Sequence, residues 1–320
     1  MQRSPPSLSL VIPVGPHDDE ALANLLASID RQAFPKESLE VLLQYEGNSE
    51  EARAEGIRQA TGDIIGCLDA DNQLLGFEFL QHMVAAALQS DVCGVYPSHY
   101  AWFADDAPLN RLFALLGGND PLAVVLGKAD RRSWLVAPRT ERVVFRGSVP
   151  TLGSNGFFVK RECVQPYWWA WRTSHIDGCQ VMAIHGHGTY TRVDTVLWHR
   201  TGLTLWSWLK KRYTYAVTLG LRPRRWRLVA TVGDWLKCGL FLLLSLCLLP
   251  SLWVSGVGYR RHRDHSWWLL PLAAAGLACV YTVALAQHLL GRVWSFALRV
   301  LRHMKLYDRV SYAKLFKTLR

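Results

Sequence analysis

Cysteine is scarce in this 320-residue chain and never occurs in a paired motif. Its seven cysteines stand at positions 67, 93, 163, 179, 238, 247 and 279, with no Cys-x-x-Cys spacing among them. An odd count without metal-ligand spacing predicts reduced, mostly packed thiols in a protein that faces the cytosol. The opening MQRSPPSLSLVIPV also lacks the pattern of a signal peptide, because its apolar run is short and begins the fold.

Acidic residues are nearly missing from the last third of the chain. Residues 206–320 carry 19 Lys and Arg against 3 Asp and Glu, whereas residues 1–205 carry 17 and 23. The formal net charge of +10 therefore divides into −6 for the first part and +16 for the last. Because these basic residues lie beside long apolar runs, the charge favours a membrane surface over nucleic acid as the partner.

Two apolar runs in this basic region are long enough to cross a bilayer. Residues 238–259 and 266–291 hold no charged side chain, and only RRHRDH separates them. Lys and Arg are abundant on both outer flanks, which predicts a transmembrane hairpin with both ends in the cytoplasm and RRHRDH on the other side. The three arginines of that turn oppose this orientation, and buried soluble helices are the alternative to a hairpin.

The segments around the two runs have the composition of a membrane interface. Residues 206–235 mix Trp and Tyr with a basic cluster, and residues 292–320 place Trp and Leu among spaced basic residues, as in-plane membrane helices do. A solvated basic helix is the alternative for the tail. We thus expect an α/β domain over 1–205, an interfacial region over 206–235, two transmembrane helices within 236–291 and an amphipathic basic helix over 292–320.

The first hundred residues alternate between strand and helix patterns. Apolar, β-branched runs predict strands over 8–14, 39–45, 63–69 and 92–97, and apolar spacing predicts helices over 18–33 and 77–89. Asn48 followed by Glu51 predicts a capping box that opens a further helix through Gln59. This alternation predicts a parallel sheet with right-handed crossovers. Residues 98–205 are less periodic, and we interpret them as loops with short elements.

Two acids, Asp69 and Asp71, follow a buried strand in GDIIGCLDADNQLL. The carboxyl edge of a parallel sheet is where α/β folds bind ligands. A pair of carboxylates at this spacing can hold a divalent cation against a diphosphate. An ordinary turn is the alternative, since Asp and Asn are common turn residues.

Five motifs in a fixed order resemble a family 2 glycosyltransferase. They are LVIPV, EVLLQYEGNS, GIRQATGDIIGCLDADNQLL, GSNGFFVKRE and HIDG, and the resemblance covers about residues 7–215. It implies an α/β fold of the GT-A type, with a Rossmann-like, mostly parallel sheet, followed here by C-terminal transmembrane segments. It also implies a nucleotide-sugar donor (a UDP- or GDP-sugar), a divalent cation (Mg²⁺ or Mn²⁺) and inversion at the anomeric carbon.

The resemblance assigns the donor site. Asp69 and Asp71 fall on the family's Asp-x-Asp motif, where the acids meet the ribose and a cation that bridges the diphosphate and neutralises the leaving group. Pro13, Val14 and Glu46 fall where the family holds the base and ribose. The usual acidic pair at the end of the second strand is Tyr-Glu here, so one acid is missing.

Further positions follow from the same resemblance. Asn155 of GSNG is expected to hydrogen-bond sugar hydroxyls, with an ordinary turn as the alternative. His199 is expected as a metal or diphosphate ligand, with packing as the alternative. Lys211 and Arg212, next to Lys210, are expected to pair with phosphates of the donor or of a lipid, with membrane anchoring as the alternative.

The catalytic base is expected in HIDG. An inverting transfer needs a group that takes the proton of the attacking hydroxyl, and the resemblance gives this role to Asp177. A structural Asp that caps a helix beginning near Gly178 is the alternative, and Asp194 is the other candidate base. His185 and His187, in HGHG, have no acidic or cysteine partner nearby in the sequence, so we interpret them as loop histidines.

The leading hypothesis is a membrane-bound, metal-dependent, inverting glycosyltransferase with a lipid-linked acceptor, acting in cell-envelope glycan or glycolipid synthesis. We expect it in the inner (cytoplasmic) membrane as a multi-pass protein whose catalytic domain faces the cytoplasm. A processive polysaccharide synthase is disfavoured, because two spans are few for a channel and no Gln-x-x-Arg-Trp motif follows HIDG. The retained acids argue against a third possibility, a non-catalytic scaffold.

Overall fold

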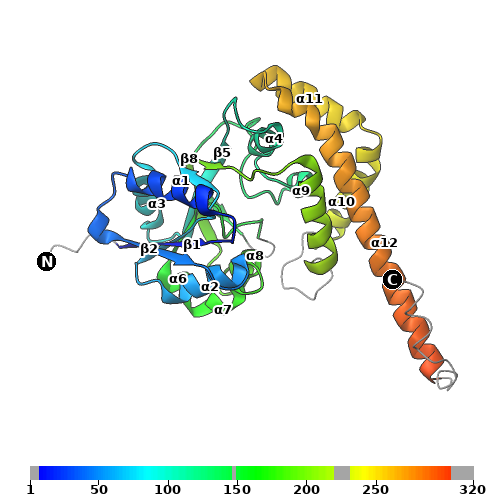
Figure 1. Cartoon of the computed structure of the whole chain (residues 1–320), viewed down its shortest axis with the longest axis horizontal. Helices are drawn as coiled ribbons and strands as arrows, with labels where there is room; N and C mark the ends of the chain where they lie inside the picture. The colour runs from blue at the N-terminus through cyan, green and yellow to red at the C-terminus, as the bar shows by residue number, and fades with distance from the viewer. Residues whose placement is uncertain (1–6, 146–148, 220–230, 304–320) are drawn as a thin grey trace.

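The computed structural model describes residues 7–145, 149–219 and 231–303, and Figure 1 shows their arrangement. The end of the predicted tail helix, residues 304–320, lies outside the described residues, as do residues 220–230 of the predicted interfacial region.

The elements alternate as the sequence predicts and then become helical. The strands are β1 (Leu8–Pro13), β2 (Leu39–Gln44), β3 (Ile64–Cys67), β4 (Asn72–Leu74), β5 (Gly94–Ala101), β6 (Glu141–Val144), β7 (Phe157–Lys160) and β8 (Thr189–His199). The helices of the sheet domain are α1 (Asp19–Asp30), α2 (Ser49–Gln59), α3 (Phe79–Ala87), α4 (Pro108–Leu116), α5 (Pro121–Val125), α6 (Arg161–Val164), α7 (Trp168–Trp171) and α8 (His175–Ile184). The C-terminal helices are α9 (Leu205–Thr214), α10 (Val232–Leu246), α11 (Leu249–His262) and α12 (Leu270–His303), with a short 3₁₀ turn at His265–Leu269 before α12.

One mixed sheet organises the domain. Its strand order is β2-β1-β3-β7-β5-β8-β4, and β6 pairs with β8. Strands β1, β2 and β3 are parallel, as are β5 and β8, whereas β7 runs antiparallel to both β3 and β5. The carboxyl ends of β1, β2, β3, β5 and β8 therefore meet at one edge of the sheet, together with the amino end of β7. The four strands that the sequence predicts, β1, β2, β3 and β5, are parallel as expected. The sheet as a whole is mixed because β4, β6 and β7 run in the other direction.

Helices cover both faces of this sheet, as Figure 1 shows. Alternate residues of β1 point to opposite faces, so Leu10 packs with α1 and α3 while Val11 packs with α2, α7 and α8. The predicted capping box is confirmed, since Asn48 accepts from the backbone N–H of Glu51 and Glu51 caps Asn48 in return. These caps fix where α2 begins, immediately after the carboxyl end of β2.

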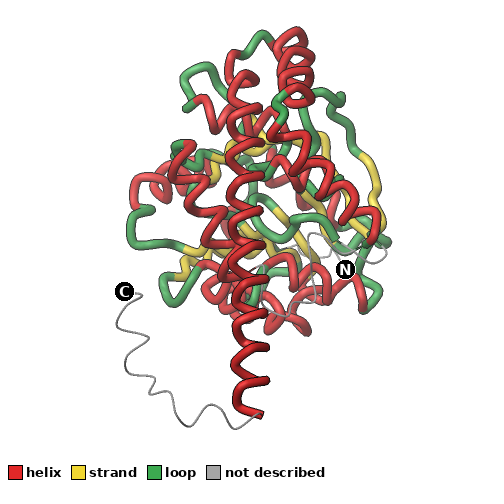
Figure 2. Tube along the Cα trace, turned by 90° about the vertical axis from the view of Figure 1, so that its right-hand side faces the viewer, coloured by secondary structure: helices red, strands yellow, loops and turns green. Residues whose placement is uncertain are grey.

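The C-terminal helices share a hydrophobic core with α4 and α5. Leu112 and Leu115 of α4 pack with Trp208 of α9, Phe241 of α10 and Leu277 of α12. Figure 2 shows α12 running along the domain and extending beyond it. Helices α4 and α5 therefore belong to the core of the C-terminal part, although the sequence places them in the first domain.

Buried ion pairs connect the same parts. Lys128 Nζ lies 2.8 Å from Asp234 Oδ2 at the start of α10, and both side chains are almost fully buried. Arg212 of α9 donates to Asn119 and lies 3.6 Å from Asp120. Buried charges persist in proteins when they are paired in this way. The C-terminal helices are thus an integral part of the folded domain.

The first predicted membrane run is not one straight helix. Residues 238–259 are divided between α10 and α11, whose axes differ by 85°. The chain turns at Leu248, which has a left-handed φ of 59°. Pro250 then stands in the first turn of α11, where a proline is tolerated because its missing N–H has no helical partner. By length and composition, the described residues offer one helix that could cross a membrane, His265–Phe296, or two if the bent pair is one span.

The basic turn RRHRDH also differs from its expected position. Arg111 of α4 lies 3.2 Å from Asp264, and His262 Nε2 lies 2.9 Å from the carbonyl oxygen of Trp134. Arg261 donates to the carbonyl oxygen of Leu135. The turn therefore packs against the sheet domain, whereas the predicted hairpin places it across the membrane from that domain.

Candidate active site

The residues predicted to bind the donor lie at the edge where the parallel strands end. Asp69 and Asp71 follow β3, Glu46 follows β2, and Asn155 directly precedes the antiparallel strand β7. His199 is the last residue of β8. Strand direction alone brings these positions together from four parts of the chain, since an antiparallel strand begins where its parallel neighbours end.

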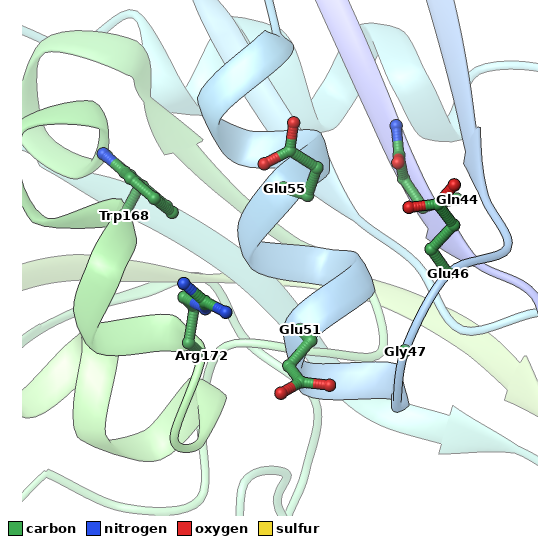
Figure 3. A pocket seen from close by; sticks show the side chains of 7 residues that line it. All are labelled: Gln44, Glu46, Gly47, Glu51, Glu55, Trp168 and Arg172. Carbon is green, nitrogen blue, oxygen red and sulfur yellow. The ribbon is translucent and has the colours of Figure 1, made fainter.

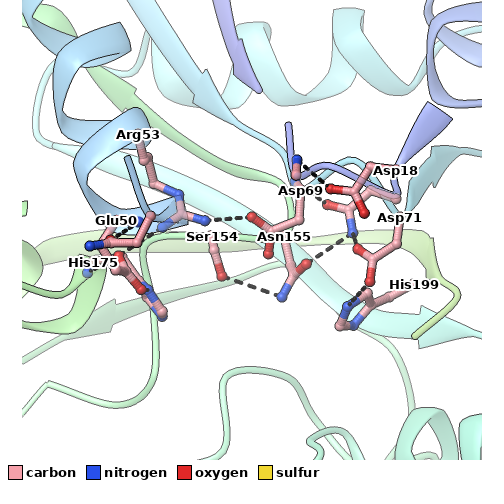
Figure 4. A network of polar contacts seen from close by, with 12 residues as sticks. Asp18, Glu50, Arg53, Asp69, Asp71, Ser154, Asn155, His175 and His199 are labelled. Atoms are coloured by element: carbon pink, nitrogen blue, oxygen red, sulfur yellow. Dashed lines mark hydrogen bonds and ion pairs between the residues drawn. The ribbon is translucent and has the colours of Figure 1, made fainter. Parts of the chain in front are cut away.

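A polar network joins four of them (Figure 4). His199 Nε2 lies 3.3 Å from Asp71 Oδ2. Asn72 donates to Asn155 Oδ1 at 2.9 Å and to Asp71 Oδ1 at 3.3 Å, and its Oδ1 accepts from the backbone N–H of Asp69. Burial lowers the pKa of His199, but the Asp71 carboxylate outweighs this effect and raises that pKa above its ordinary value.

Asp69 is held by a second network that reaches α8. Its Oδ1 lies 2.5 Å from Arg53 Nη2, and Arg53 Nη1 lies 2.8 Å from Glu50 Oε2. Glu50 Oε1 lies 2.7 Å from His175 Nδ1 at the start of α8. Burial raises the pKa of Glu50, but His175 and Arg53 outweigh this effect and lower it to about 2. Asp69 and Asp71 are therefore oriented by different partners, Arg53 and His199.

The GSNG loop is shaped by its backbone and by a buried arginine. Asn155 has a φ of 50°, in the left-handed region that Asn tolerates better than most residues. Arg131, whose side chain is fully buried, donates to the carbonyl oxygen of Asn155 and stacks on Tyr100. The side chain of Asn155 is thereby directed at Asn72. Gly153 packs so closely on α8 that a Cβ there would meet the carbonyl oxygen of His175 at 2.8 Å.

Asp177 lies in the first turn of α8, below this loop. The helix begins at His175 rather than near Gly178, and its N-cap is Ser174, whose side chain accepts from the backbone N–H of Ile176. The capping role proposed as the alternative for Asp177 is therefore wrong. Asp177 is 5% exposed, whereas Asp194, the other candidate base, is exposed in the middle of β8.

Glu46 lines an open pocket of about 330 Å³ beside α2. Figure 3 shows Glu46 with Gln44 on one side of α2, and Trp168 of α7 with the following Arg172 on the other. The pocket is bounded by acidic side chains of α2, including Glu51 and Glu55. Pro13 and Val14 are buried at the end of β1, where the Val14 N–H donates to the carbonyl oxygen of Gln44.

The basic pair of α9 is placed differently from the acids. Arg212 is bound to Asn119 and Asp120, which commits its guanidinium to the core of the C-terminal part. Lys211 is exposed, and its ammonium lies 6.0 Å from the ring centre of Tyr215. The contacts of Arg212 favour a structural function over the predicted one in phosphate binding.

Asp71 and His199 fit a divalent cation. Two neighbouring ligands of an octahedral ion with bonds of about 2.1 Å lie about 3 Å apart, and these two ligand atoms are 3.3 Å apart. Both side chains are partly exposed at the sheet edge, and carboxylate with imidazole suits Mn²⁺ better than Mg²⁺, which prefers oxygen ligands. Asp69 Oδ1 is paired with Arg53, so Asp69 can bind the same cation only through its other carboxylate oxygen, Oδ2.

Three residues of the site have no role predicted from the sequence. Arg53, Asn72 and Arg131 are all buried and polar, and each bonds a predicted site residue. In the sequence, Arg53 is a charged residue on the apolar face of α2. This position is the sequence signal that could have identified it as a site residue. Asn72 directly follows Asp71, and Arg131 lies in a segment without clear periodicity.

Comparison with known proteins agrees with this geometry. Residues 18–149 match the sequence profile described as Glycosyl transferase family 2. The chain contains a family 2 glycosyltransferase domain. The match includes Asp69 and Asp71, and the glycosyltransferase motifs around Asn155, Asp177 and His199 lie beyond its end.

Solved structures resemble the chain only distantly. A mannosyltransferase, PcManGT from Pyrobaculum calidifontis in complex with GDP-Man and Mn²⁺, is 14% identical with a TM-score of 0.49, covering 88% of each chain. S. aureus TarS 1–349 in complex with UDP is 13% identical with a TM-score of 0.40, covering 89% of this chain and 92% of its own. GalNAc-T7 with UDP, GalNAc and Mn²⁺ is 13% identical with a TM-score of 0.40, covering 68% and 51%. No curated protein sequence matches the chain.

Proposed function

We propose that this protein transfers a sugar from a nucleoside diphosphate sugar, with inversion, to a lipid-linked acceptor at a membrane surface. The observation that carries the proposal is the pairing of Asp71 with His199, 3.3 Å apart, at the carboxyl edge of a family 2 glycosyltransferase domain. These residues are 128 positions apart, and Asn72 connects them to the GSNG loop through Asn155.

Asp71 and His199 would hold Mn²⁺ or Mg²⁺, with Asp69 beside them. A cation bound there neutralises the charge that develops on the leaving nucleoside diphosphate. Arg53 fixes Asp69 in an orientation suited to a ribose hydroxyl, because one carboxylate oxygen is occupied by the guanidinium and the other stays available. Asn155 holds its side chain toward the same edge, where it can bind sugar hydroxyls.

Asp177 would take the proton from the attacking acceptor hydroxyl. It lies in the first turn of α8, where the helix dipole favours its ionised form. The close packing of Gly153 on His175 places this turn directly under the GSNG loop. An inverting transfer needs one such base within hydrogen-bond reach of the acceptor hydroxyl.

The enzymatic proposal is tested with purified full-length protein and a panel of UDP- and GDP-sugars with Mn²⁺. Asp71→Asn should abolish metal-dependent donor turnover, and Asp177→Asn should lower turnover by orders of magnitude while leaving donor affinity nearly unchanged. Asp30→Asn, at the exposed end of α1, is the matched control. Wild-type rates in Asp71→Asn would exclude the cation site. Normal turnover in Asp177→Asn, with Asp194→Asn inactive, would move the base to Asp194.

The membrane part of the proposal rests on exposed apolar side chains. On α10, Trp235, Leu236, Leu240 and Leu243 are 55–71% exposed, while Phe241 packs inward. A face of this kind is rare on soluble proteins and common on helices that lie in a bilayer interface. Because RRHRDH contacts the sheet domain, we propose that α10 and α11 enter the membrane and return to the same side.

Helix α12 combines a packed face with exposed apolar side chains. Leu270, Ala273 and Leu277 in its first half belong to the core shared with α4, and large apolar side chains are exposed at Leu272 and from Val283 to Phe296. Because the first half of α12 packs on α4, we propose that α12 lies along the membrane with its exposed side chains in lipid, in place of the multi-pass arrangement that the sequence predicts.

Membrane association is tested by flotation with vesicles that contain anionic lipid. The triple variant Leu236→Glu, Leu240→Glu, Leu243→Glu should lose vesicle binding and transfer to lipid acceptors while keeping donor hydrolysis. The control is Leu88→Glu, an exposed leucine at the end of α3. Reporters placed before residue 7 and within RRHRDH should give the same side of the membrane, and opposite sides would restore the transmembrane hairpin.

A further inference from the structure

A second cluster of metal-ligating side chains lies at the sheet edge opposite the active site. Cys93 immediately precedes β5, Cys163 lies in α6 after β7, and His187 stands two residues before β8. The amino ends of β5 and β8 and the carboxyl end of β7 meet here by the same rule of strand direction that gathers the acids at the other edge. Three separate segments thus converge on one point.

The ligand atoms of these three residues lie within 4.8 Å of one another. Both cysteines are 6% exposed, and His187 is half-buried. The cluster is therefore closed to solvent on its thiol side and accessible on its imidazole side, which gives an ion a path of entry. It is the one group of three such ligands found in the described residues.

The backbone fixes each of the three positions. The Cys93 N–H donates to the carbonyl oxygen of Thr189 at 2.8 Å, and the Cys93 carbonyl oxygen accepts from the Lys160 N–H at 2.9 Å. Helix α8 ends in a Schellman motif, in which Gly186 has a φ of 89° and the His187 N–H donates to the carbonyl oxygen of Met182. The backbone of the HGHG turn therefore orients His187 toward the two cysteines.

We propose that Cys93, Cys163 and His187 bind one Zn²⁺ ion, which fastens α6 and the α8–β8 turn to the start of β5. Two thiolates and an imidazole are the ligand types that zinc prefers, and a water molecule completes a tetrahedral set. The inference is independent of the proposed transferase activity, because no residue of the acid edge takes part in it.

The spacing is close to that of a zinc site. Bonds of about 2.3 Å to sulfur and about 2.0 Å to nitrogen place tetrahedral ligands about 3.5–3.8 Å apart. Ligand atoms within 4.8 Å reach this separation by contracting about 1 Å, which side-chain rotation supplies.

Strand β8 separates this cluster from the catalytic edge. His187 lies two residues before its start and His199 is its last residue, so the two histidines stand at opposite ends of a strand that spans about 33 Å at ~3.3 Å per residue. The two candidate metal sites therefore differ in place and in chemistry. Carboxylate with imidazole selects a hard catalytic cation, whereas two thiolates with imidazole select zinc.

The test is the zinc content of purified full-length protein after exposure to Zn²⁺ and desalting. Wild-type protein should retain one zinc ion per chain, and Cys93→Ser, Cys163→Ser and His187→Asn should each fall to background. Cobalt substitution should give a thiolate charge-transfer band that Cys163→Ser removes. Cys247→Ser, an exposed cysteine, and His185→Asn, the neighbouring histidine, are the matched controls and should keep the ion.

Thermal unfolding distinguishes loss of the ion from loss of the fold. In chelator, the variants and wild type should melt at similar temperatures, and added Zn²⁺ should raise the melting temperature of wild type alone. Zinc retained in the double variant Cys93→Ser, Cys163→Ser would overturn the proposal. So would a wild-type protein that binds no zinc, including one in which thiol counting finds Cys93 and Cys163 joined in a disulfide.

Discussion

Arg53 is the residue on which the charge balance of the active site depends. Its side chain is 3% exposed and lies between the carboxylates of Asp69 and Glu50. A buried cation between two acids orients both of them, and its removal leaves Asp69 without its cation and Glu50 with His175 as its remaining partner. Site geometry and stability are therefore coupled through one side chain.

Replacing Arg53 should cost stability as well as donor binding. We expect Arg53→Met to lower the free energy of unfolding by about 3–5 kcal/mol, as breaking a buried ion pair does. Denaturant titration measures the change, with Arg58→Met as control because Arg58 is exposed on the same helix. A loss of donor affinity with unchanged stability would mean that Asp69 and Glu50 do not need the guanidinium for folding.

Glu50 predicts a pH dependence of stability. Its pKa is lowered from 4.5 to about 2 in the folded protein, so the folded state favours the ionised carboxylate. The stabilisation is fully present above pH ~4.5 and is lost as the pH falls toward ~2. Glu50→Gln should therefore be less stable at pH 7 and should lose less stability than wild type across this window. Parallel curves for the two proteins, measured by urea unfolding, would contradict the assignment.

At the scale of elements, the end of α8 depends on one glycine. Gly186 occupies the left-handed position of the Schellman motif with a φ of 89°, and a Cβ there would meet nothing within 4 Å. Its substitution is thus limited by backbone conformation and not by space. The direction of His187 and the start of β8 both follow from this turn.

Gly186→Ala should destabilise the protein by about 1–2 kcal/mol, the cost of the left-handed conformation for a residue with a Cβ. Gly186→Asn is the matched comparison and should lose less, because Asn tolerates this region better. Thermal unfolding in chelator measures both without a contribution from zinc. Equal losses in the two variants would show that side-chain size, and not φ, limits the position.

At the scale of the whole molecule, the catalytic part and the C-terminal helices form one folding unit. Leu112, Leu115 and Leu116 of α4 are buried against α9, α10 and α12. Lys128 and Arg111 are each paired with an aspartate of the C-terminal part, Asp234 and Asp264. Removal of those helices exposes both an apolar surface and two uncompensated cations.

Truncation after residue 205 should therefore give an aggregating protein and not a soluble transferase. The physical reason is the exposure of α4 and α5, whose core side chains lie against the removed helices. Gel filtration of the truncated and full-length proteins in the same detergent measures the difference. A monomeric, cooperatively unfolding fragment would show that the first 205 residues fold alone, as the sequence suggests.

The sequence by itself determined the local features. Runs of apolar residues specify β1, β2 and β3, the Asn48–Glu51 pair specifies the start of α2, and Asp69 and Asp71 are read directly as acids at a strand end. These features can be predicted because hydrophobic periodicity and helix capping involve only residues that are close together in the sequence. The family motifs then predicted which distant residues meet, and His199 does lie beside Asp71.

Only the tertiary structure decided the rest. Arg53 and Arg131 are recognised as site residues because, when buried, they contact Asp69 and the carbonyl oxygen of Asn155 at the sheet edge. A local sequence pattern does not predict which arginines are buried. The packing of RRHRDH on Trp134 joins residues that are more than a hundred positions apart in the chain. His187 looked isolated in the sequence for the same reason. Cys93 lies at the start of β5, and Cys163 lies just after the end of β7. The direction of these strands, and not their composition, brings the two cysteines close to His187.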